Sequence, residues 1–261
     1  MMLSSCSHSY YTPSDNIIAA LKEKKEIKVV GTYVPKPNLM KPSPREKAVA
    51  GSLQIGYSPI KHIAVAGTYF NLSEKYIRPA NGSKTFNNWN LALGVYHFFN
   101  FTKRTENNKA ANADPIETSK FRGLLLNLYA GYGQGNASNT YINEGTSSLE
   151  FEKYFAQIGL HYMTKHFELG GSINHAILNY YDGITIQVLD PELRNIESIF
   201  FNNPFYPMTA NFKIATGTRN LKLYLNINRL IFPNTKLRTQ DPLATVGLQV
   251  NLNGLMHKIR N

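Results

Sequence analysis

The stretch from Leu149 to Tyr180 alternates apolar with polar or small side chains along two consecutive arms, and this pattern constrains the fold most. A period of two predicts β-strands, and each arm is about twice the five or six residues usual in soluble sheets. Strands that cross a bilayer need about 9–11 residues when tilted. Tyr154 and Tyr162 bracket the apolar row of the first arm, where membrane barrels carry aromatic girdles. The hairpin therefore predicts membrane-spanning strands.

Eight further segments alternate in the same way: 26–34, 47–57, 61–72, 89–99, 121–132, 206–216, 221–230 and 244–253. Together with the two arms of the hairpin, these segments predict about ten strands. An antiparallel barrel that closes with an even number of strands has both ends of the chain on the same side. The predicted fold is an all-β, transmembrane, antiparallel up-and-down β-barrel over residues 26–253. An N-terminal tether, 1–25, precedes it, and a periplasmic tail, 254–261, follows it.

The connections between these segments sort by length. Short turns are predicted at 57–60, 163–166 and 217–220, all on one side of the barrel. Longer connections on the other side are predicted at 35–46, 72–88, 133–150, 180–205 and 231–242. Bacterial outer-membrane barrels have short periplasmic turns and longer outer loops, which predicts this orientation and location. The exception is 100–120, a long polar segment on the predicted periplasmic side.

The distribution of charge agrees with a membrane barrel. The chain has no run of 18 apolar residues that would predict a transmembrane helix. In hydrocarbon only a helix or a closed sheet pairs all backbone N–H and C=O groups, so a barrel is the remaining spanning structure. The outward rows are nearly free of charge, whereas the inward rows are predicted to carry Lys28, Lys153, Lys213, Lys222 and Glu168.

The chain is basic, with 28 Lys+Arg against 17 Asp+Glu and a formal net charge of +11. No helix or stripe concentrates the Arg and Lys residues, so nucleic acid is not a predicted partner. A basic surface suits the anionic headgroup layer of a membrane. The predicted partners are outer-membrane lipids, lipopolysaccharide and other outer-membrane proteins.

Cys6 is the single cysteine, so no internal disulfide can form. It follows Leu3, Ser4 and Ser5, which resembles a bacterial lipobox, whose cysteine becomes lipid-modified. Only five residues precede it, fewer than a secretory signal needs. Either the true start lies upstream and Cys6 is lipidated, or Cys6 is an ordinary thiol. We expect lipidation of Cys6.

Several short stretches resemble a family of Bacteroidota outer-membrane barrel proteins. They are LKEKKEIKVVGTY, GSLQIGYSPIKHIAVAGTYFN, LYAGYGQGN, EKYFAQIGLHYMTKHFELGGS and TVGLQVNLNG, in this order. The resemblance covers nearly all of the chain after Cys6 and implies the barrel fold, the outer-membrane location and lipidation of Cys6. The chain departs from it at Lys25, where the family tends to have Gly, and in its longer 100–120 segment. The resemblance implies little about activity.

No catalytic constellation is apparent in the sequence. The histidines of the predicted strands and turns lie on different segments: His62, His97, His161, His166 and His175. His161 and Glu168 are expected to share one end of the lumen as a satisfied polar pair. The acids of the outer loops do not adjoin a histidine in a recognisable motif. We therefore expect no enzyme activity, no catalytic residue, no cofactor and no metal.

Two functions remain open. A narrow solute pore is one, although ten strands leave little room and Tyr96, Tyr129, Tyr224 and Phe155 are predicted to point inward. The leading hypothesis is a structural or accessory subunit of a larger outer-membrane complex for protein assembly, secretion or transport. In that hypothesis the lipid tether, the outer loops and the 100–120 segment would contact partners.

Overall fold

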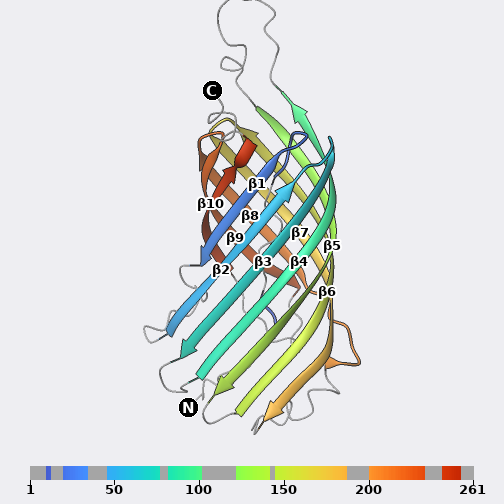
Figure 1. The fold of residues 1–261 in the computed structure, drawn as a ribbon, viewed down its shortest axis with the longest axis vertical. Helices are drawn as coiled ribbons and strands as arrows, with labels where there is room; N and C mark the ends of the chain where they lie inside the picture. The colour runs from blue at the N-terminus through green and yellow to red at the C-terminus, as the bar shows by residue number, and fades with distance from the viewer. Residues whose placement is uncertain are drawn as a thin grey trace, which may run out of the picture.

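Ten antiparallel strands form one closed barrel (Figure 1). The computed structural model describes residues 10–12, 20–34, 46–76, 82–101, 122–141, 145–186, 200–232 and 243–253. The strands are β1 Ile27–Val34, β2 Glu46–Tyr57, β3 Ile63–Tyr76, β4 Gly82–Asn100, β5 Arg122–Tyr141, β6 Gly145–Thr164, β7 Phe167–Ile186, β8 Met208–Gly217, β9 Leu221–Phe232 and β10 Leu243–Asn251. Each strand pairs with its neighbours in sequence, and β1 pairs with β10 to close the sheet. The predicted all-β up-and-down barrel is confirmed.

The two ends of the barrel differ in their connections. We call the end with the short connections after β2, β6 and β8 the turn end, and the opposite end the loop end. Residues 102–121, which include most of the predicted 100–120 segment, lie outside the described residues, as do Cys6 and the predicted tail 254–261. In the described part of the chain, no helix has the length and hydrophobicity needed to cross a membrane.

The predicted alternation places apolar side chains on the outside of the barrel. Leu93, Leu128 and Ile158 lie outward and are 65%, 51% and 52% exposed. On the same strands, Asn90, Asn127 and Gln157 point inward and are buried. Successive strand residues face opposite sides, so an apolar outer surface and a polar lumen follow from one period-two pattern. Such an exterior is compatible with hydrocarbon, and the protein is a transmembrane barrel.

Two rows of exposed aromatic residues limit the apolar surface. The row toward the loop end contains Tyr33, Tyr69, Trp89 and Tyr154, and the row toward the turn end contains Tyr57, Phe99 and Phe167. On β4, the ten residue steps from Trp89 to Phe99 extend about 33 Å along the strand. At a tilt near 40° this gives a height of about 25 Å, the usual apolar band of outer-membrane barrels. We call the surface between the two rows the belt.

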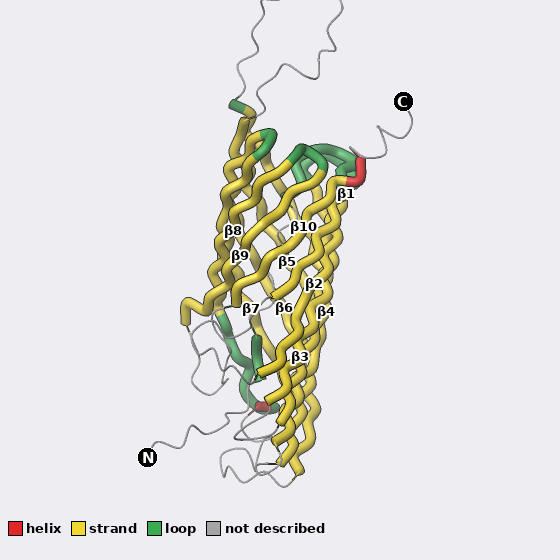
Figure 2. Tube along the Cα trace, turned by 90° about the vertical axis from the view of Figure 1, so that its left-hand side faces the viewer, coloured by secondary structure: helices red, strands yellow, loops and turns green. Residues whose placement is uncertain are grey.

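Strands β3 to β7 continue beyond the belt at the loop end, and Figures 1 and 2 show the barrel taller on this side. The predicted long loops at 72–88 and 133–150 are therefore wrong, because the connections are confined to 77–81 and 142–144. The outward residues of these extensions include Ser73, Thr85, Ser138 and Ser148. Beyond the belt the outer side is mostly polar, although Ile184 and Ile186 of β7 are exposed there, and the inner side carries several rings. Backbone pairing continues across this region. We call this outward polar surface the wall.

Part of the predicted N-terminal tether lies inside the barrel. Tyr10, Tyr11 and Thr12 are 0–2% exposed, and Ala20 and Leu21 are at most 1% exposed. The two pieces contact different parts of the lumen, toward the loop end and the turn end respectively. These described residues are not an external tether, because their rings and aliphatic groups are buried against inward side chains.

Candidate functional site

The lumen at the loop end is filled by an aromatic cluster from three parts of the chain. The strands contribute Phe70, Phe86, Phe151 and Tyr180, the N-terminal piece contributes Tyr10 and Tyr11, and the segment before β8 contributes Phe200 and Phe205. The ring centroids of Tyr11 and Phe86 lie 6.2 Å apart, and those of Tyr10 and Phe200 lie 5.0 Å apart. Such ring pairs contribute about 0.5–1.5 kcal/mol each beyond the area they bury. The cluster closes this end of the lumen in the described residues.

Hydrogen bonds fix Tyr10 within this cluster. Its hydroxyl donates to Ser147 Oγ at 2.9 Å, and the Tyr180 hydroxyl donates to the Tyr10 carbonyl oxygen at 3.0 Å. Both partners belong to the barrel, on β6 and β7. A buried tyrosine hydroxyl needs such partners, so the position of Tyr10 is specified by the polar groups of the lumen as well as by ring packing.

Residues 205–207 extend the pairing between β7 and β8 beyond the start of β8. The backbone N–H of Leu178 donates to the Phe205 carbonyl at 2.8 Å, and the N–H of Phe205 donates to the Leu178 carbonyl at 3.0 Å. This pairing points the Phe205 ring into the lumen, where its centroid lies 5.4 Å from that of Phe200. The composition of 180–205 predicts a loop and gives no signal of this contribution to the lumen.

The middle of the lumen is lined by buried amide side chains. Asn211 Nδ2 lies 2.7 Å from Asn228 Oδ1 and donates to it, and Asn90 Nδ2 donates to Thr68 Oγ1 at 2.8 Å. In the described part of the protein, the Oδ1 atoms of Asn90 and Asn127 have no hydrogen-bond partner. Buried polar atoms of this kind are ordinarily satisfied by ordered water. The middle of the lumen is therefore a polar section between its two closed ends.

A cluster of buried charges lies in the lumen near the turn end. Glu168 Oε1 lies 2.8 Å from Lys213 Nζ, and Glu168 Oε2 lies 3.5 Å from Lys222 Nζ. Lys213 Nζ also donates to Gln249 Oε1 at 2.9 Å. His161 Nδ1 lies 3.5 Å from Glu168 Oε1, so the two residues lie together as predicted, but neither ring nitrogen of His161 has a hydrogen-bond partner among the described residues. One carboxylate thus serves as the counter-ion of two buried ammonium groups contributed by two other strands.

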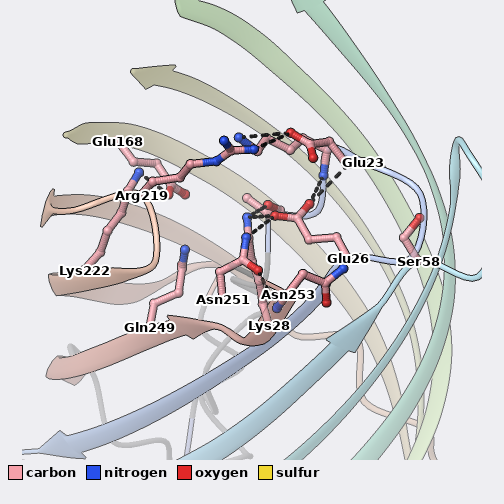
Figure 3. A network of polar contacts seen from close by, with 12 residues as sticks. Glu23, Glu26, Lys28, Ser58, Glu168, Arg219, Lys222, Gln249, Asn251 and Asn253 are labelled. Carbon is pink, nitrogen blue, oxygen red and sulfur yellow. Dashed lines mark hydrogen bonds and ion pairs between the residues drawn. The ribbon is translucent and has the colours of Figure 1, made fainter. Parts of the chain in front are cut away.

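Glu26 holds the N-terminal piece at the turn end (Figure 3). Its Oε2 accepts hydrogen bonds from the backbone N–H groups of Lys22 at 2.7 Å and Glu23 at 3.2 Å. Its Oε1 accepts from Asn251 Nδ2 at 2.9 Å and lies 3.2 Å from Lys28 Nζ. Burial and the nearby Lys28 ammonium lower the pKa of Lys22 from its ordinary value. A single carboxylate therefore joins the N-terminal piece to β1 and β10.

Several inward side chains lie over a glycine on the neighbouring strand. Tyr129 pairs with Gly94, and His161 pairs with Gly170. A Cβ added at Gly94 would fall 2.3 Å from the Tyr129 ring, and one at Gly170 would fall 2.2 Å from His161 Nδ1. The absence of side chains at these glycines makes room for rings on the inner face of the sheet. A narrow barrel can therefore contain many inward rings.

We expect Gly170→Ala to lower the free energy of unfolding by about 1–3 kcal/mol, the usual cost of overpacking a core. The added methyl group displaces the His161 imidazole, to which the three heavy atoms nearest the new Cβ all belong. The matched control is Gly67→Ala, which meets nothing within 4 Å. Denaturant unfolding in detergent measures both variants. Adding His161→Ala should restore most of the lost stability, and a double variant as unstable as Gly170→Ala would contradict the ring–glycine explanation.

The other histidines named from the sequence form no common site, although two of them meet. His62 stacks on His97 with ring centroids 5.3 Å apart at the turn end, and His175 lies outward beside Tyr206. No group of three or more His, Cys, Asp or Glu in the described ranges could hold a metal ion. The expectations of no cofactor and no enzyme activity stay predictions, as does lipidation of Cys6.

Comparison with known proteins identifies no family: no protein-family model and no curated protein matches the sequence. The resemblance to Bacteroidota barrel proteins therefore stays a prediction. Solved structures with similar folds include the KdgM porin in complex with disordered oligogalacturonate, at 10% identity and a TM-score of 0.33 over 85% of this chain and 98% of that one. An outer-membrane channel from Pseudomonas putida F1 has 10% identity and a TM-score of 0.35 over 90% and 97%. The outer-membrane protease OmpT from Escherichia coli has 13% identity and a TM-score of 0.37 over 87% and 94%. At these TM-scores the similarity does not assign a function.

Proposed function

We propose that the protein is a non-enzymatic integral barrel of the bacterial outer membrane that acts as a structural or accessory subunit of a larger membrane complex. The observation that carries the proposal is the filled lumen. Rings at the loop end and the Glu26 contacts at the turn end close the lumen as far as the described residues define it. A barrel closed at both ends is a rigid membrane anchor, and its outer surfaces are what partners can contact.

The wall supports a role in partner binding. It stands beyond the belt on five adjacent strands, and its outward side chains are mostly Ser, Thr, Asn and charged groups. Strands longer than the bilayer requires are not explained by membrane spanning alone. An extended polar sheet surface outside the membrane provides many hydrogen-bonding groups in fixed positions. We infer that another outer-membrane protein rests against this surface.

The test is co-purification from the native membrane in gentle detergent. Thr85→Arg and Ser148→Arg together add two large cations to the wall, on the two strands that flank Ser138. We expect at least a tenfold loss of the co-purifying protein with an unchanged β-sheet circular dichroism spectrum, because buried cations without partners oppose association. The control is Thr216→Arg, an exposed residue at the turn end. Recovery of the same partners by all variants, or of none by the wild type, would contradict the proposal.

A second candidate function is a narrow pore that is closed at rest. The buried charged residues of the lumen favour it, because the lysines Lys28, Lys84, Lys153, Lys213 and Lys222 outnumber the glutamates Glu26, Glu74 and Glu168 among the described residues. A rigid anchor has no need for such a surplus in its interior. The amide-lined middle section is also more polar than packing alone requires.

A further inference from the structure

The N-terminal segment takes part in both closures of the lumen. Toward the loop end, Tyr10 and Tyr11 complete the aromatic cluster, and toward the turn end, residues 20–26 are held by the Glu26 carboxylate. The remaining parts of both closures belong to the barrel and to the segment before β8. Displacing one segment would therefore loosen the lumen at both ends at once.

We propose that this segment is a displaceable plug and that its removal opens an anion-selective path through the barrel. The proposal extends the second candidate function and is independent of partner binding at the wall. The first observation that supports it is the packing of Leu21. Leu21 packs in a cluster that contains the inward alanines Ala64, Ala66 and Ala92 of β3 and β4. Small side chains on adjacent strands leave space along this side of the lumen, and Leu21 occupies it.

Most polar contacts of the plug at the turn end are made by the Glu26 carboxylate, and the Lys25 backbone adds a hydrogen bond to the Ser58 carbonyl at 2.6 Å and one from Asn253 Nδ2. Glu26 adjoins β1, and the N–H of Ser58 donates to its carbonyl oxygen at 3.0 Å, which fixes Glu26 to the barrel. Its carboxylate then receives the N–H groups of Lys22 and Glu23 from the plug. Lys28 Nζ, which lies beside the Glu26 carboxylate, donates to the Ala20 carbonyl oxygen. A closure in which residues 20–23 are held mainly by one carboxylate and one ammonium can be released without unfolding the strands.

The charge of the barrel determines which ions would pass. Among the described residues the lumen carries five buried lysines, Lys28, Lys84, Lys153, Lys213 and Lys222, against three buried glutamates, Glu26, Glu74 and Glu168. Cationic side chains in a narrow lumen of low dielectric attract anions and exclude cations. The favoured solutes are small anions, for which chloride is the simplest probe.

Planar-bilayer recording of the full chain in a potassium chloride gradient tests the proposal. We expect the wild type to be mostly closed. Glu26→Ala removes the carboxylate that holds the plug, and we expect at least a tenfold increase in open time, with a reversal potential displaced toward the chloride equilibrium potential. The matched control is Glu23→Ala, which removes only the ion pairs of an exposed carboxylate with Lys22 and Arg219, both at 3.5 Å. This variant should behave as the wild type.

A second readout follows the plug itself. Leu21→Cys in a Cys6→Ala background carries its thiol in a buried position, so a charged maleimide should label it at least tenfold faster when Glu26→Ala is added. If Glu26→Ala does not fold, bilayer recording of Leu21→Ser tests the proposal instead. This substitution weakens the apolar packing of the plug and keeps the Glu26 contacts. A folded Glu26→Ala variant that stays closed and unlabelled would overturn the proposal, and so would a folded Leu21→Ser variant that stays closed or an open state that prefers potassium. Lys153→Gln in the open variant should reduce the preference for chloride.

Discussion

Glu168→Gln should lower the free energy of unfolding by about 3–5 kcal/mol, the cost of removing one partner from a buried ion pair. The Glu168 carboxylate is fully buried and lies within 3.5 Å of the ammonium groups of both Lys213 and Lys222. Glutamine keeps the size of the side chain but removes the charge. Two buried cations would then lack their counter-ion in a part of the barrel that provides few other acids.

Denaturant unfolding of the detergent-folded barrel measures this effect. Adding Lys213→Met to Glu168→Gln should recover a large part of the loss, because the pair is removed together and its desolvation cost disappears. The control is Glu150→Gln, an exposed acid of β6 whose carboxylate accepts from the Tyr181 hydroxyl at 3.2 Å. We expect at most about 0.5 kcal/mol there, as for most surface substitutions. Equal losses at Glu168 and Glu150 would show that the cluster does not act as an ion pair.

The location of these charges illustrates what sequence patterns can predict. The alternation along each strand placed Lys213, Lys222 and Glu168 inward correctly, because hydrocarbon excludes charge from the opposite face. It did not identify Gln249 as a partner of Lys213, because that contact depends on the position of each strand along its neighbours. The arrangement of Gly94 under Tyr129 depends on register in the same way.

The two ends of the strands show where the sequence signal disappears. Within the belt, lipid outside and polar groups inside make the two faces chemically different, and all ten strands were predicted. Residues 133–141 of β5 lie beyond the belt, where both faces are polar or small, and their Gly, Asn and Ser content favoured a loop. The backbone pairs continue regardless of this composition. Loop lengths predict the orientation less strongly than the alternation predicts the strands, because the loop-end connections 77–81 and 142–144 are short.

The plug was not predicted because its burial depends on space inside the barrel. Tyr10, Tyr11 and Leu21 show no period-two pattern, and a short polar segment with prolines resembles a tether. Only the closed sheet reveals that inward alanines and glycines leave room for a chain. The segment before β8, which contributes Phe200 and Phe205, was missed for the same reason.

Leu128→Arg should destabilise the barrel by about 2–4 kcal/mol, the cost of a lipid-facing arginine near the bilayer midplane. Leu128 lies outward on β5 within the belt and is 51% exposed. Its neighbours on the adjacent strands, Val95 and Ile158, are apolar and outward as well. The guanidinium group therefore has no acidic partner on either side and must reach toward the headgroups or thin the bilayer.

Thr140→Arg on the same strand is the matched test of where the membrane ends. Thr140 is also outward and exposed, but it lies on the wall, where arginine remains in water, and we expect a change below about 0.5 kcal/mol. Unfolding of both variants from lipid vesicles, rather than from detergent, measures the difference, because the cost of Leu128→Arg arises from hydrocarbon. Similar costs at the two positions would mean that the bilayer also covers the wall. A large cost at Leu128 alone would locate the loop-end surface of the bilayer between the two residues. The wall would then lie in water and be free for a partner.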